Sequence, residues 1–200
     1  MNTPNKLTVL RMILVPFFVA SLLAGDSLPH HNLIALVIFA AASYTDHLDG
    51  KIARSRNLVT TFGKFMDPLA DKIMVISALV CFVSQGLADV WLVLLIIFRE
   101  FMVTSVRLVA ADTGVVVAAN NWGKAKTVSQ IVAILAILFL QYLLELVSIG
   151  VLPAFTVFGG DPAAWFTFFG NLLLLVATAL ALLSGLIYLI QNWKIVAREM

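Results

Sequence analysis

The chain has 200 residues, of which 62% are hydrophobic and only 12% are charged, and its formal net charge is +2. With a mean hydropathy of +1.02, this balance excludes an ordinary soluble domain, because runs such as WLVLLIIF leave no polar face for water. A bilayer core takes roughly 20 apolar residues per helical span, so the length allows about six spans and no further soluble domain. We therefore expect a single integral membrane domain over residues 1–200, with membrane lipids around it and no nucleic-acid partner.

Apolar segments along the chain predict an all-α fold of six transmembrane helices, separated by clusters of Gly, Pro, Asn and Asp. In chain order the predicted helices cover residues 7–24, 32–52, 68–86, 89–110, 126–149 and 164–190. A membrane β-barrel is excluded, because it needs segments of about ten residues with alternating polarity and these runs are apolar on every side.

The basic residues are distributed unevenly between the connections. The connections after the first, third and fifth predicted helices contain no Lys or Arg, whereas the termini and the other two connections, with the helix ends beside them, carry all of them except Arg99. Cytoplasmic segments of membrane proteins are enriched in Lys and Arg, so this pattern predicts that both termini lie in the cytoplasm. We expect a multi-pass protein of a bacterial inner membrane.

Four aspartates occupy the segment YTDHLDGKIARSRNLVTTFGKFMDPLADK, which joins the second and third predicted helices. Asp46 and Asp49 are three residues apart, and Asp67 and Asp71 are four apart, so each pair projects from one helical face. Four carboxylates at the edge of lipid repel one another unless cations neutralise them. All-oxygen ligands favour Mg²⁺ or Mn²⁺, and the number of carboxylates suits two ions. The alternative is that these aspartates are solvated helix ends, which is strongest for Asp67 because Pro68 follows it.

These aspartates belong to a longer pattern that resembles the complete signature of the CDP-alcohol phosphotransferase family. Its eight positions are Asp46, Asp49, Gly50, Ala53, Arg54, Gly63, Asp67 and Asp71. Eight residue types at fixed spacing are a specific signal, and the six-helix fold of the family agrees with the count of spans above.

The resemblance implies an enzyme in which the four aspartates hold two divalent ions, Mg²⁺ or Mn²⁺, at the diphosphate of CDP-diacylglycerol. Asp71 would also be the general base for the acceptor alcohol, whose hydroxyl attacks the lipid-side phosphorus while CMP leaves. The implied nucleotide-binding residues are Gly50, Ala53, Arg54 and Gly63, with Asn5 and Thr8 from the opening PNKLTVLR. Separately, Arg54 could be an interfacial side chain, and Asn5 and Thr8 could be helix caps. The resemblance also implies a homodimer with its active site at the cytoplasmic ends of helices two and three.

The acceptor alcohol is suggested by the segment 99–130, which resembles the branch of the family that produces phosphatidylglycerophosphate. An acceptor that is itself a phosphate monoester, such as glycerol 3-phosphate, needs fixed cations near the metal site. Arg107, Lys124 and Lys126 can supply them, and Thr127 adds a hydroxyl donor. The alternatives are that these cations only follow the distribution of cytoplasmic charge, or that the acceptor is inositol phosphate or serine.

Charged and polar residues inside the predicted spans form a separate question. Arg99 and Glu100 should each find a partner in the interior of the bundle, because charges in lipid are expensive. Gln141 and Glu145 lie toward the outer side and have no predicted function. Intramembrane carboxylates also mark ion pathways, so a divalent-cation transporter is a distant alternative, although all four aspartates gather at one end.

Overall fold

The computed structural model describes residues 3–56, 61–112 and 121–196, and within these ranges it leaves some side chains undescribed. Those side chains belong to residues 3–6, 26, 46–56, 61–68, 71, 109, 111–112, 121 and 194–196. In the described part the chain forms six α-helices: α1 Thr3–Leu23, α2 His31–Arg56, α3 Thr61–Ser84, α4 Val90–Asp112, α5 Asn121–Ser148 and α6 Pro162–Val196. The prediction of an all-helical fold is therefore confirmed.

Two helices begin at aspartate caps that can be recognised in the sequence. Asp89 Oδ1 accepts the backbone N–H of Trp91 at 2.8 Å and so satisfies the first turn of α4. Asp161 Oδ1 accepts the N–H of Ala163 at 3.2 Å, and Pro162 occupies the first position of α6, where its missing N–H costs nothing. The caps explain why α4 and α6 begin where they do.

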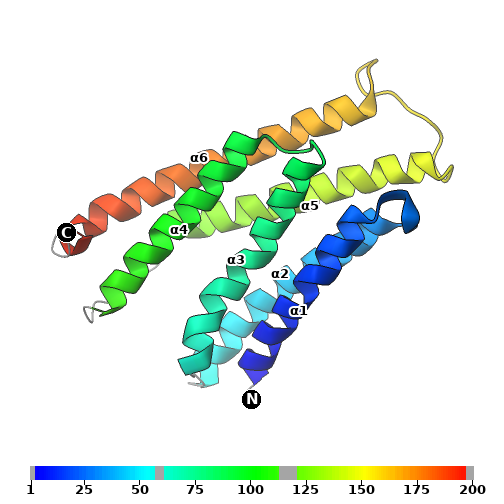
Figure 1. Ribbon diagram of the computed structural model, residues 1–200. Helices are drawn as coiled ribbons and strands as arrows, with labels where there is room; N and C mark the ends of the chain where they lie inside the picture. Colours follow the sequence, from blue (N-terminus) through cyan, green and yellow to red (C-terminus); the bar gives the residue numbers. More distant parts are fainter. Residues whose placement is uncertain (1–2, 57–60, 113–120, 197–200) are drawn as a thin grey trace.

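The helices form two groups that share one apolar core (Figure 1). In the first group α1 packs against α2 and α3, and in the second α6 packs against α4 and α5. Contacts between α2 and α5 join the groups. Fully buried side chains such as Phe18, Phe39, Phe82 and Leu138 fill the space between them, with the rings of Phe18 and Phe39 5.9 Å apart.

One end of the bundle, here called the loop end, contains the connections 24–30, 85–89 and 149–161 (Figure 1). Side chains tie these connections to the helices. Asn171 of α6 accepts the Asp89 N–H at 2.7 Å and donates to the Leu87 carbonyl at 3.2 Å, while Gln85 donates to the Leu22 carbonyl at 2.9 Å. Both chain termini lie at the opposite end, here called the terminal end.

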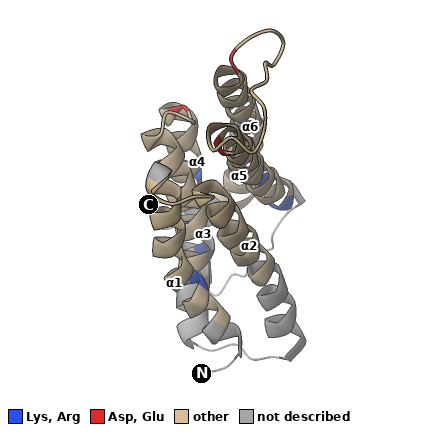
Figure 2. Ribbon diagram, turned by 90° about the vertical axis from the view of Figure 1, so that its right-hand side faces the viewer, with Lys and Arg blue, Asp and Glu red and all other residues tan. Residues whose placement is uncertain are grey.

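Charge separates along the bundle, as Figure 2 shows for the described residues. Described acidic side chains other than Glu100 belong to the loop half, namely Asp89, Glu145 and Asp161. The described basic side chains lie near the middle of their helices or closer to the terminal end, namely Arg11, Lys72, Arg99, Arg107, Lys124 and Lys126. The connections at the loop end contain no Lys or Arg, as the sequence pattern required.

The surface of the bundle is apolar over much of its length. Large side chains such as Phe17, Trp91, Phe98 and Ile190 are exposed, which suits lipid rather than water. Among the described residues, two helical stretches, 122–148 and 162–193, are long and apolar enough to cross a membrane. Shorter apolar stretches cover 7–23, 31–45 and 72–84. A membrane protein is thus plausible, and the six spans stay a prediction.

Candidate functional site: paired aspartates and a buried charge network

The two aspartate pairs of the signature lie on consecutive helices. Asp46 and Asp49 belong to α2, near its end, and Asp67 and Asp71 belong to the first half of α3. Each pair sits on continuous helix, so the members of a pair share a face as predicted. α2 and α3 contact each other, and α1 packs against both of them. The backbone thereby supplies two aspartate-bearing helices beside α1.

The donor set of these aspartates fits hard divalent cations, because it consists of carboxylate oxygens with no Cys or His in the signature. The side chains of all four aspartates lie outside the described residues. Among the side chains that are described, no group of three or more His, Cys, Asp or Glu could hold a metal. The prediction of a metal site therefore depends on the four aspartates alone.

The predicted nucleotide-binding residues lie on the same three helices. Gly50, Ala53 and Arg54 belong to α2 and Gly63 to α3, and their side-chain surroundings, like those of Asn5, lie outside the described residues. Thr8 is described, and it is buried in α1 at 3% exposure. Its burial places the start of α1 against neighbouring helices, and its predicted contact with a nucleotide stays a prediction.

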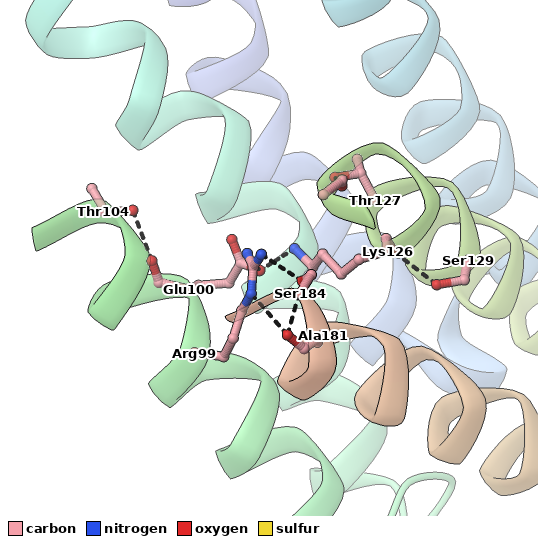
Figure 3. Close-up of polar contacts among 9 residues, drawn as sticks. Arg99, Glu100, Thr104, Lys126, Thr127, Ser129, Ala181 and Ser184 are labelled. Atoms are coloured by element: carbon pink, nitrogen blue, oxygen red, sulfur yellow. Dashed lines mark hydrogen bonds and ion pairs between the residues drawn. The ribbon is translucent and has the colours of Figure 1, made fainter. Parts of the chain in front are cut away.

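A network of three buried charges joins α4, α5 and α6 (Figure 3). The residues are Arg99, Glu100 and Lys126, exposed by only 7%, 8% and 5%. Glu100 Oε1 accepts from Arg99 Nη1 at 3.3 Å and also from Lys126 Nζ. One carboxylate thus serves two cations, so these three side chains together carry a formal charge of +1.

The remaining donors of Arg99 go to α6. Nε donates to the Ala181 carbonyl at 3.1 Å, and Nη2 donates to Ser184 Oγ at 2.7 Å. Gly185 makes room for this side chain, since a Cβ at that position would lie 3.1 Å from Arg99 Cγ. Buried charges are tolerated only when they are paired and hydrogen-bonded, and both conditions are met here. The prediction that Arg99 and Glu100 find interior partners is confirmed.

The predicted acceptor residues on α5 occupy two different faces of that helix. Lys126 faces the interior and binds Glu100, whereas Lys124 and Thr127 are exposed. The Thr127 hydroxyl donates to the Gly123 carbonyl at 3.1 Å, which is a hydrogen bond within α5. The structure therefore joins Lys126 to the charge network and leaves the other two residues on the surface.

The fourth predicted acceptor residue, Arg107, lies eight residues after Arg99 and so on the same face of α4. Its side chain is exposed, and its guanidinium carbon lies 5.6 Å from the ring centroid of Tyr188 on α6. Such a cation–π contact is worth about 0.5–1 kcal/mol at an exposed site. Tyr188 thus limits the positions that Arg107 can adopt.

Sequence reasoning missed the contribution of α6. The residues that receive Arg99 and Arg107 are Ala181, Ser184, Gly185 and Tyr188. A signal for them was present, because small residues recur at helical spacing within ALALLSGLIY, and such residues permit close helix contact in membranes. The mean hydropathy of the span does not show this spacing of small residues.

A second buried carboxylate, Glu145 of α5, lies at the loop end and away from this network. Glu145 Oε2 accepts the backbone N–H of Asn32 at 3.1 Å, and Oε1 lies 3.1 Å from His31 Nδ1. The Asn32 side chain approaches His31 Nε2 at 3.0 Å. Glu145 therefore stabilises the first turn of α2.

Comparison with known proteins gives a consistent result. Residues 1–158 match the CDP-alcohol phosphatidyltransferase family. A Bacillus subtilis protein named CDP-diacylglycerol–glycerol-3-phosphate 3-phosphatidyltransferase is 43% identical, over 96% of each chain. Proteins of the same name from Pseudomonas fluorescens and Haemophilus influenzae are 35% and 40% identical, covering 96% and 66% of this chain and 91% and 73% of their own. The match spans every position of the aspartate signature, and the chain belongs to the CDP-alcohol phosphatidyltransferase family.

Proposed function

We propose that the protein transfers the phosphatidyl group of CDP-diacylglycerol to sn-glycerol 3-phosphate, which yields phosphatidylglycerophosphate and CMP in phospholipid biosynthesis. One observation carries the proposal: the complete signature lies on α2 and α3 of a chain that is similar, over 96% of its length, to relatives named for this reaction. The two buried cations of the network, Arg99 and Lys126, support a phosphate-bearing acceptor.

The residues that would hold the metal ions are Asp46, Asp49, Asp67 and Asp71. Two Mg²⁺ or Mn²⁺ ions bound there would neutralise the carboxylates and stabilise negative charge on phosphate oxygens. Gly50, Ala53, Arg54 and Gly63, with Asn5 and Thr8 from α1, would bind the cytidine nucleotide. Arg54 suits a phosphate oxygen because a guanidinium can donate two parallel hydrogen bonds.

Asp71 would accept the proton of the reacting acceptor hydroxyl. The hydroxyl oxygen then forms a bond to the lipid-side phosphorus, and the bond from that phosphorus to the oxygen of CMP breaks. No covalent intermediate with the protein is needed. The chain contributes by holding donor and acceptor in line and by receiving one proton.

The acceptor would be bound by the cations near the start of α5 and near the end of α4. Lys126 would bind the acceptor phosphate from the buried side, and Arg107, Lys124 and Thr127 from the exposed side. Glu100 of α4 binds the Lys126 ammonium, and Arg99 binds both Glu100 and Ser184 of α6. Together, Glu100 and Arg99 would keep the Lys126 ammonium in place. These two residues are positioning residues in this proposal.

The same proposal includes the membrane, the orientation and the oligomeric state of the enzyme. We infer six transmembrane helices in a bacterial inner membrane, with both termini and the active site in the cytoplasm, and a homodimer. The placement of the described basic side chains away from the loop end supports this orientation.

The test is CMP release by the purified protein in lipid vesicles that contain CDP-diacylglycerol. We expect release with glycerol 3-phosphate and Mg²⁺ or Mn²⁺, and none with serine or inositol phosphate. Chelation of the metal should stop release, and re-addition should restore it. Release with another alcohol instead would contradict the proposed acceptor, and transport of metal without any CMP release would favour a transporter.

A further inference from the structure

Gln130 of α5 is one of the most deeply buried polar residues of the described chain. Its side chain is only 2% exposed, and its Nε2 atom has no hydrogen-bond partner among the described residues. Buried amide groups are nearly always satisfied, because an unpaired donor loses its hydrogen bonds to water and gains nothing in return. A carboxamide at this depth therefore calls for a partner beyond the described residues.

The position of Gln130 identifies the kind of partner. It follows Lys126 by four residues, so both side chains lie on the same buried face of α5, about 6 Å apart along the helix axis. For the next two turns beyond Gln130 the buried positions of this face are apolar: Ala133, Ile134 and Ile137. Gln130 is thus the last polar group on this face before the hydrophobic core.

We propose that Gln130 is an acceptor-binding residue whose carboxamide N–H donates to an oxygen of the acceptor when the acceptor phosphate binds Lys126. Glycerol 3-phosphate carries phosphate and hydroxyl oxygens within a few ångströms of one another, so a group held at Lys126 brings an oxygen to the next helical turn. This inference rests on the proposed function and adds a residue on the core side of the acceptor.

A purely structural role makes the opposite prediction for one substitution. If Gln130 only fills space, Gln130→Met replaces an unpaired amide with an apolar group of similar volume, so stability rises or stays the same and kinetics do not change. If Gln130 binds the acceptor, the same variant keeps its stability and loses acceptor affinity.

The experiment compares wild type, Gln130→Met and the matched control Gln141→Met in vesicles. Gln141 lies on the same helix, eleven residues further toward the loop end, and is partly exposed. For Gln130→Met we expect an acceptor KM about tenfold higher, a donor KM within about twofold of wild type, and an unchanged or higher melting temperature. Gln141→Met should match wild type in every quantity. Gln130→Leu, a second apolar variant, should repeat the result if the methionine variant is poorly produced.

Two outcomes would contradict this role. The first is a Gln130→Met variant with the acceptor KM of wild type, whatever its melting temperature, and the second is an equal rise in both KM values. If the wild type is active and Gln130→Met behaves like Gln141→Met, only this inference fails. If the wild type releases no CMP with glycerol 3-phosphate, the proposed function fails and the inference fails with it.

Discussion

Two buried glutamates on consecutive helices have similar surroundings but different roles. Glu100 and Glu145 are exposed by 8% and 7%, and each pairs with a basic side chain. Glu145 holds partners that are neighbours in sequence, His31 and the Asn32 backbone, at the start of one helix. Glu100 instead holds Arg99 and Lys126 and so joins three helices.

The difference lies in what remains unsatisfied. At the loop end, the Glu145 carboxylate accepts one backbone N–H and lies against the His31 imidazole, so the buried atom left without a hydrogen bond there is an acceptor, Oε1. At the network, one carboxylate meets two cations, and the unpaired amide of Gln130 lies one turn away. Burial and pairing are common to both regions, whereas two buried cations with an amide donor one turn away distinguish the region suited to a phosphate.

The largest expected difference in kcat is between one aspartate substitution in the signature and one at the loop end. Asp71→Asn removes the proposed base and keeps an oxygen ligand, so kcat should fall about 100-fold or more while CDP-diacylglycerol still binds. Asp161→Asn at the loop end should leave kcat unchanged, since asparagine also caps the N–H of Ala163. Initial rates of CMP release and donor binding measure both. Full turnover in Asp71→Asn would remove that residue from the mechanism.

A second contrast separates the two faces of α5. Lys126→Met should raise the acceptor KM about 10- to 100-fold, because a hydrogen bond to a charged group is worth about 1.5–3 kcal/mol. Lys124→Met, on the exposed face, should raise it about threefold. Neither variant should change the donor KM. Equal effects on donor and acceptor would indicate a general role of surface charge.

The two glutamates themselves provide the third test. Glu100→Gln leaves Arg99 and Lys126 without an anion between them, which should cost about 2 kcal/mol and lower the melting temperature by about 4–8 °C. The acceptor kcat/KM should fall about fivefold in the same variant, because the Lys126 ammonium is no longer held.

Glu145→Gln is the matched control for that test. It should cost about 1 kcal/mol, since glutamine keeps an acceptor for the Asn32 N–H, and it should leave all kinetic constants unchanged. Thermal unfolding in vesicles and acceptor titrations distinguish the two variants. A loss of acceptor kcat/KM in Glu145→Gln would mean that the two ends are coupled, against the separation described above.

The smallest expected effect concerns two buried glycines of α6. An added Cβ would lie 3.1 Å from Arg99 Cγ at Gly185 and 3.0 Å from Ile137 Cγ1 at Gly170. In both variants, crowding of about 1 kcal/mol is offset by a helix-propensity gain of about 1 kcal/mol, so melting temperatures should barely change. Gly185→Ala should raise the acceptor KM about twofold, because the methyl group displaces Arg99, and Gly170→Ala should not. Identical acceptor KM values would show that Arg99 tolerates the shift.

Hydropathy predicted the helices well and their ends less well. The last helix was expected over 164–190 and observed over Pro162–Val196, and the fifth was expected from 126 and begins at Asn121. Helical hydrogen bonding continues into polar segments that a search for apolar runs excludes. The helix count and the pairing of aspartates on α2 and α3 were predictable, because both depend on local periodicity.

The contacts of the charge network were less predictable. Sequence reasoning expected partners for Arg99 and Glu100, because isolated charges in lipid are expensive, but it could not name them. Arg99 binds Ala181 and Ser184, more than 80 positions along the chain. The small residues of α6 indicate a close helix contact, but they do not tell which helix or which side chain makes it. The depth of Gln130 was equally invisible, since a glutamine four residues after a lysine also fits an exposed face.

The hydrogen bonds from Arg99 to α6 have a consequence for how the protein could be divided. The family match ends at residue 158, yet the groups that receive this guanidinium begin at Ala181. A fragment that stops before Pro162 would contain the whole signature and the acceptor lysines, but its buried arginine would keep only Glu100 and lose both acceptors on α6. Supplying residues 162–200 as a separate polypeptide should restore folding and turnover together, so the smallest self-sufficient enzyme is larger than the segment that defines its family.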